Sequence, residues 1–165
     1  MIWARRLLPL LVLLVVALMF ANSAGERTRF RQDMSAVKAI STIHMAETQY
    51  YSQYGQYAIS LTQLGPPTSG TAGPGGAELI DRDLASGEKG GFKFTLQPTA
   101  TGYAVAAVPV QFGTAGTHTY FSDQSMSIHQ HNGQEAATVA DPLIGESQKE
   151  QAAPASSSPA PAPAQ

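Results

Sequence analysis

The pattern of apolar and polar positions is clearest between residues 34 and 65. Apolar and aromatic side chains recur there at spacings of three and four, which places them on one face of an α-helix. We therefore expect a helix from Arg27 to Tyr54, with Asp33 as a candidate N-cap if the helix begins afresh there. Gly55 can close it in the left-handed conformation. The predicted buried face consists of Ala36, Ala39, Ile40, Ile43, Ala46, Tyr50, Tyr54 and Tyr57.

Downstream, the period of the pattern changes from 3.6 to two. Phe92, Phe94 and Leu96 alternate with polar residues, as in a half-buried strand. Three more short strand-like stretches follow, and the short turns between them favour an antiparallel meander over crossover connections. The predicted strands cover residues 92–97, 103–108, 118–121 and 126–130.

The segment between the long helix and the first strand contains two further elements. Residues 55–76 are rich in Gly, Pro, Ser and Thr and are predicted to form a loop that Leu61 and Leu64 hold against the core. A short helix is expected over Ala77–Ser86. The predicted fold class is α+β, with the long N-terminal helix packed on a four-stranded antiparallel sheet.

Both ends of the 165-residue chain differ from this central part. Arg5 and Arg6 precede an apolar run from Leu7 to Ala21, and small residues follow it. This order is typical of a secretory signal peptide. The alternative is an uncleaved membrane helix from Ile2 to Ala21, a stretch that would just span the bilayer core at a rise of about 1.5 Å per residue. We therefore divide the chain into a signal anchor or signal peptide at 1–25, an α+β domain at 26–145, and a disordered tail rich in Ala, Pro and Ser at 146–165.

Charge and cysteine content narrow the function classes. A net charge of −2 and the lack of a basic groove argue against nucleic-acid binding. The chain has no cysteine, which excludes disulfides, thiolate metal sites and cysteine nucleophiles. Arg27, Arg29 and Arg31 follow the apolar run and offset Arg5 and Arg6, so the positive-inside rule does not choose an orientation. The leader-like start favours export.

Three segments carry a family resemblance: SAVKAISTIHMAETQYYSQYGQYAISLTQLG, AELIDRDLASGEKGGFKFTL and TYFSDQSMSIHQ. Over roughly residues 34 to 145, the chain resembles bacterial type IV pilins and pseudopilins. The resemblance implies a structural or assembly protein of a pilus or a type II secretion-type system, with the membrane and other pilin-like subunits as partners. The chain departs from the family in one respect. No Gly precedes the apolar run and no Glu lies within it, so the prepilin peptidase site and the usual intersubunit charge pair are missing.

Four polar side chains near the last two predicted strands were weighed as a metal site. His129 and His131 share one strand face, and His118 and Asp123 could approach them from the neighbouring strand. The favoured interpretation is a solvated hairpin face, because the three histidines have no fourth ligand at a matching spacing and His44 lies on the distant helix.

Other candidate groups have similarly plain interpretations. Glu47 is interpreted as a surface residue of the long helix, with pairing to a neighbouring subunit as the alternative. The aromatic group around Tyr50 is interpreted as core and rim packing, with an adhesive or conductive patch as the alternative. No G-x-S-x-G or phosphate-binding loop motif occurs. Four acidic residues are expected on a solvated helix face, since they lack calcium-loop spacing: Glu78, Asp81, Asp83 and Glu88.

These observations predict a non-catalytic, membrane-tethered protein that needs no cofactor and no metal. Its expected location is the inner membrane with the domain in the periplasm, or the cell surface after secretion. The alternative is a free periplasmic binding module released by leader cleavage. A small hydrolase would need turnover that depends on His118, His129 or Asp123, and the spacing of these residues does not favour it.

Overall fold

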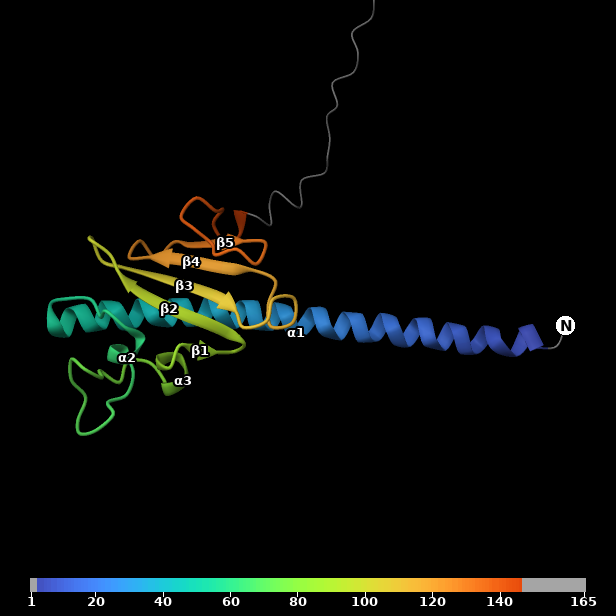
Figure 1. The fold of residues 1–165 in the computed structure, drawn as a ribbon, viewed down its shortest axis with the longest axis horizontal. Coiled ribbons are helices and arrows are strands. Elements are labelled where there is room, and N and C mark those ends of the chain that lie inside the picture. The colour runs from blue at the N-terminus through green and yellow to red at the C-terminus, as the bar shows by residue number, and fades with distance from the viewer. Residues whose placement is uncertain (1–2, 147–165) are drawn as a thin grey trace, which may run out of the picture.

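The computed structural model describes the backbone of residues 3–146 and the side chains of residues 25–146. One long helix, α1 (Trp3–Tyr54), dominates its shape. The C-terminal half of α1 lies against an antiparallel sheet, whereas its N-terminal part extends away from the rest of the molecule (Figure 1). The predicted α+β class is confirmed, and the sheet with its connecting loops is called the head below.

The sheet is a simple meander whose five strands lie side by side in chain order. All four pairings are antiparallel, so the prediction of a meander is correct and the predicted number of strands is short by one. The strands are β1 (Glu88–Lys89), β2 (Phe92–Pro98), β3 (Tyr103–Pro109), β4 (Thr119–Asp123) and β5 (Ile128–His131).

The additional strand, β1, arises from a two-glycine turn. Lys89 pairs with Phe92, so Gly90 and Gly91 alone connect the two strands. Their φ angles of 60° and 83° suit a two-residue hairpin of the type that glycine favours. Two consecutive glycines before an alternating stretch were therefore the sequence signal for a strand only two residues long.

The segment after α1 is more structured than predicted. Gly55 closes α1 as expected, with φ 71° and an amide that donates to the Tyr51 carbonyl at 2.8 Å. The predicted loop contains the short helix α2 (Leu61–Leu64), whose first turn is capped by the Ser60 side chain. Leu61 and Leu64 are both buried, so the prediction that they hold this segment to the core is confirmed.

The helix predicted over Ala77–Ser86 is shorter than expected, since only α3 (Arg82–Ala85) forms. The backbone amides of residues 77–80 donate instead to the carbonyls of residues 63–65, and this pairing holds them outside a helix. Asp81 then starts α3 by accepting a hydrogen bond from the Leu84 amide at 3.0 Å.

The core lies between α1 and the sheet. Ile40, Ile43 and Tyr50 on the helix are fully buried, as are Phe92 and Val105 on the sheet. This is the face that the 3.6-residue period predicted. Burying such side chains removes about 25 cal/mol of apolar hydration cost per Å², which makes this contact the main stabilising feature of the head.

Two predictions fall outside the described residues. The side chains of residues 1–24, which make up almost all of the predicted signal anchor or signal peptide at 1–25, lie outside the described part. The predicted tail lies outside it from residue 147 onward. Among the residues whose side chains are described, no helix combines the length and apolar composition needed to cross a membrane.

Candidate functional site

The most distinctive polar feature is a hydrogen-bonded chain between α1 and the sheet. His44 is only 4% exposed. Its Nδ1 lies 2.7 Å from the Tyr103 hydroxyl on β3, and its Nε2 lies 2.7 Å from Ser122 Oγ on β4. The Ser122 hydroxyl donates onward to the Ser127 carbonyl at 2.8 Å, in the turn between β4 and β5. A single helical side chain thus connects α1 to two strands and a turn.

The hydrogen bonds around His44 indicate which of its ring nitrogens carries a proton. Because Ser122 uses its only proton on the Ser127 carbonyl, its oxygen must accept from His44 Nε2. In a neutral ring, His44 Nδ1 is then unprotonated and accepts from the Tyr103 hydroxyl. Burial lowers the pKa of His44, and the nearby Asp123 partly opposes this shift. His44 is therefore a neutral, structural histidine.

The same geometry argues against a serine nucleophile. A catalytic serine donates its proton to the histidine and faces the substrate. Ser122 instead accepts from His44 and is fully buried. The pair brings together residues 78 positions apart that no sequence motif links. The structure therefore supplies a Ser–His contact that sequence reasoning missed, but not the hydrogen-bond direction that nucleophilic catalysis requires.

Glu47 was predicted to lie on the surface, and this prediction is wrong, since its side chain is 0% exposed. One carboxyl oxygen accepts from the Ala58 amide at 2.9 Å, and the other has no hydrogen-bond partner within the described part of the chain. Burial raises the pKa of Glu47 to about 7, and the Ala58 bond opposes this rise. The sequence did contain a signal, because Glu47 lies in helical phase with Ile40, Ile43 and Tyr50.

Asp33 does not cap a fresh helix, because α1 continues through it without a break. The Asp33 carboxylate is 5% exposed and points at the loop between β3 and β4. It lies 3.2 Å from both the Thr117 hydroxyl and His118 Nδ1. In the same loop, a Cβ on Gly116 would come within 2.4 Å of the Phe92 ring, so the loop can approach the helix only with glycine there.

The histidines weighed as metal ligands are not brought together. His118 contacts Asp33 at one end of β4, whereas His129 and His131 on β5 contact the segment after it. His129 Nδ1 donates to the Asp141 carbonyl at 2.6 Å, and His131 Nδ1 lies 2.7 Å from the Asp141 carboxylate. The hydrogen bond from His131, followed by that from the Thr138 amide, lowers the pKa of Asp141. Within residues 25–146, no three potential ligands converge as a metal site.

Asp123, the remaining member of that predicted group, forms a local turn contact instead. Its carboxylate accepts from the Ser125 amide at 2.8 Å. The hydrogen bonds from Ser125 lower the pKa of Asp123. The residues on which a small hydrolase would depend, His118, His129 and Asp123, therefore have separate structural partners.

The acidic and aromatic groups have the surroundings that were predicted for them. The four acidic residues around α3 are all exposed as predicted, but only Asp83 lies on the helix, so they do not form one helix face. Asp81 forms an ion pair with Lys89. Tyr50 is buried and donates to the Pro74 carbonyl at 2.7 Å, whereas Tyr51 is 49% exposed. The rings of Tyr51 and Tyr57 stack with centroids 4.7 Å apart, and Tyr57 also contacts Tyr103. Core and rim packing is therefore the role that the structure assigns to these tyrosines.

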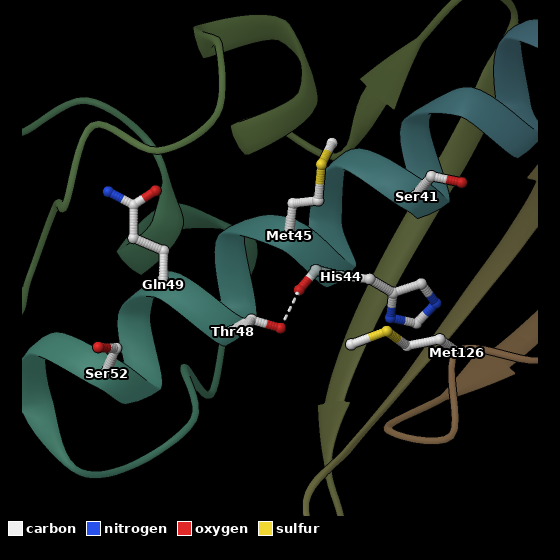
Figure 2. A pocket seen from close by; sticks show the side chains of 7 residues that line it. All are labelled: Ser41, His44, Met45, Thr48, Gln49, Ser52 and Met126. Atoms are coloured by element: carbon white, nitrogen blue, oxygen red, sulfur yellow. Dashed lines mark hydrogen bonds between the residues drawn. The ribbon is translucent and has the colours of Figure 1, made fainter.

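A shallow groove runs along the outward side of α1. We call it the outer groove; it has a volume of about 530 Å³. Figure 2 shows its residues, with Met126 reaching from the β4–β5 turn towards the His44 ring. Met45 and Met126 are 66% and 53% exposed, so apolar side chains face solvent there. The lining residues are Ser41, His44, Met45, Thr48, Gln49, Ser52 and Met126.

Comparison of the chain with protein-family models, with curated proteins and with solved structures gives no match. The resemblance to pilins therefore stays a prediction from the residues of this chain.

Proposed function

We propose that this protein is a non-catalytic, membrane-tethered, pilin-like subunit that serves in the structure or assembly of a pilus or a type II secretion-type system. In this proposal the segment before residue 25 anchors the chain in the inner membrane, and the head lies in the periplasm. The observation that carries it is the form of α1. A single helix has one half packed on a meander sheet and the other half extending beyond it (Figure 1).

The outward side of α1 supports a role in contacts between subunits. Its hydroxyl groups donate to the helix backbone, from Ser41 to the Val37 carbonyl at 3.1 Å and from Thr48 to the His44 carbonyl at 2.9 Å. Because these donors are already satisfied, covering the face would leave few hydrogen bonds unmade. The exposed Met45 adds a flexible apolar contact. Such a face suits packing against another helix better than binding a polar small molecule.

The departure of this chain from the pilin pattern bears on which kind of subunit it is. The apolar run contains no acidic residue, so the chain lacks the charge pair by which pilin subunits contact one another in a filament. We therefore place it among anchored assembly or accessory subunits rather than among the main polymerising subunits.

Cysteine cross-linking in membranes tests this proposal, since any introduced cysteine is unique in a chain that has none. Full-length Met45→Cys should form cross-linked adducts on mild oxidation in bacterial membranes. Thr95→Cys, an exposed position on β2, is the matched control and should not. Protease added to spheroplasts should digest the head.

The opposite result would favour the released binding module. In that case the protein would be recovered soluble from the periplasm, with a mature N-terminus near residue 24, and neither cysteine variant would give adducts.

A further inference from the structure

The described residues contain an uneven distribution of charge along α1. Residues 25–31 contain three arginines and one glutamate, a formal charge of +2. Residues 32–146 contain four Lys and Arg against ten Asp and Glu, a formal charge of −6. Without Asp33 and Glu47, which are buried on α1, eight acidic residues of the head remain against three basic ones, and Lys38 on α1 is the fourth basic residue of this range. Positive charge is therefore concentrated in one short stretch at the base of the head.

The three arginines surround the helix rather than lining one side. Arg27 and Arg31 are four residues apart and share a side, whereas Arg29 lies on the opposite side. Arg27 and Arg31 are exposed, and Phe30 between them is 59% exposed. Within residues 25–146, none of the three arginines forms an ion pair with a carboxylate. We call Arg27, Arg29, Phe30 and Arg31 the collar.

We propose that the collar binds the anionic lipid headgroups of the membrane in which the chain is anchored, and that the acidic head is held off the same surface by repulsion. The inference rests on the membrane tether proposed above. Its partner is the surface of a bilayer that contains lipids such as phosphatidylglycerol.

The position of the collar fits this partner. The apolar run ends at Ala21, and six helical residues later Arg27 lies about 9 Å further along the axis, close to the outer limit of the headgroup layer. Cα–Cβ bonds in a helix tilt towards its N-terminus, so the arginine side chains extend back towards the bilayer. Phe30 gives the collar an apolar side chain that can enter the headgroup layer.

The charge distribution also sets an orientation. At physiological ionic strength the field of an anionic surface decays over about 8 Å. The collar lies within that distance of the headgroups, whereas the head lies along the C-terminal part of α1 (Figure 1), which extends about 30 Å further along the axis. Tilting of α1 would bring the acidic head into the field, where it would be repelled. Attraction at the base and this repulsion on tilting therefore favour an upright α1, with the outer groove clear of the membrane.

Fluorescence quenching on the full-length chain tests the collar. Met34, 39% exposed and just beyond the collar, is replaced by cysteine and labelled with a polarity-sensitive fluorophore. The protein is reconstituted in phosphatidylcholine vesicles with or without phosphatidylglycerol, and each preparation contains a headgroup-linked nitroxide quencher. We expect quenching to be at least about twofold stronger with phosphatidylglycerol, and to fall at 1 M salt, where the Debye length is about 3 Å.

Two variants of equal charge change separate the collar from general electrostatics. Arg27→Gln/Arg29→Gln/Arg31→Gln should lose the dependence on phosphatidylglycerol and on salt. Arg82→Gln/Lys89→Gln/Lys93→Gln removes three positive charges from the head and should keep both. Equal quenching in the wild type and the collar variant would overturn the inference.

Flotation of the same samples distinguishes the two proposals. If the chain floats with pure phosphatidylcholine vesicles but the collar variant quenches like the wild type, the tether stands and the collar role fails. If the chain does not float with any vesicles, both proposals fail.

Discussion

Where α1 passes along the head, one side of the helix packs on the sheet and the other side faces away from it, and the two sides differ in an unexpected way. The side packed on the sheet contains a histidine and a glutamate that are almost fully buried, His44 and Glu47. The outward side exposes Met45, which directly follows His44 in the sequence. On this helix, polar side chains are therefore not confined to the exposed side, and apolar side chains are not confined to the buried side. Instead, His44 has partners on the sheet, and one Glu47 oxygen accepts from the Ala58 amide in the segment after α1. Each outward hydroxyl described above bonds to the helix itself.

The difference shows that the two sides of α1 have separate roles. One side fixes the position of the helix on the sheet, and the other is available for contacts with a neighbour. Hydrogen bonds of His44 can form in only one register of helix against sheet, so they fix where α1 lies. Within the described residues, the outward side has no such fixed partner, and its contacts with a neighbour can vary. A comparison of matched changes on the two sides tests this division.

The largest effect on the free energy of unfolding is expected when His44 is removed. His44→Ala leaves the buried Tyr103 hydroxyl without an acceptor and opens a cavity, so we expect a loss of about 3–5 kcal/mol in the free energy of unfolding. Met45→Ala, one residue along and on the outward side, should change it by less than about 0.5 kcal/mol. Urea unfolding of the full chain in mild detergent, followed by tyrosine fluorescence, measures both. Similar losses in the two variants would contradict the division.

An intermediate effect is expected at Glu47, and it depends on pH. The folded-state pKa of about 7 lies above the ordinary value of 4.5, so the folded chain holds an extra proton between these pH values. Stability due to this residue is therefore complete below pH 4.5 and lost as pH rises through 7, by on the order of 3 kcal/mol. Glu47→Gln keeps an acceptor for the Ala58 amide and should raise stability at pH 8 by about 1–3 kcal/mol, with little change at pH 4.5.

His44 supplies the internal control for this pH dependence. Burial lowers its pKa from 6.5, so its contribution is complete above pH 6.5 and is lost as pH falls towards the lowered value. The two slopes oppose each other in the wild type. In Glu47→Gln only the loss at low pH should remain, and in His44→Gln only the loss at high pH. Thermal unfolding between pH 4 and 8 would contradict this account if both variants kept the wild-type profile.

The smallest effect is expected on the outward side. Thr48→Val removes a hydroxyl that donates to the helix backbone and keeps the branched shape. Because that bond competes weakly with the helix's own hydrogen bonds, we expect a change of less than about 0.5 kcal/mol in either direction. Melting temperature by circular dichroism measures it. A loss above about 1 kcal/mol would mean that this hydroxyl has a structural partner comparable to those of His44.

Much of the fold could be predicted because its elements follow simple periods. The spacing of Ile40, Ile43 and Tyr50 identified the buried face of α1, and the alternation of Phe92, Phe94 and Leu96 identified β2. Gly55 marked the end of α1 correctly. These signals are local, so a single sequence contains them. The short helix around residue 80 was over-extended because its amides pair with carbonyls that lie some 14 residues away.

The polar cluster was missed because it depends on contacts across the fold. His44 meets Ser122 and Tyr103 only once α1 lies on the sheet, and no spacing along the chain encodes that meeting. Glu47 was assigned to the surface from its charge, although its helical phase matched that of the buried residues. For this helix, phase predicted burial better than residue type did.

The segment after β5 has a consequence for how this protein can associate. The Gln130 amide donates to the Pro142 carbonyl, and the Ile144 amide donates to the Ile128 carbonyl, so residues 142–144 cover the outer edge of β5. At the opposite border of the sheet, the edge strand β1 consists only of Glu88 and Lys89. β1 pairs only with Phe92 and Lys93 of β2, whereas the covered β5 edge leaves no long row of free backbone groups within the described residues. Copies of this protein therefore cannot readily add a strand beside β5, and contacts at that border depend on side chains.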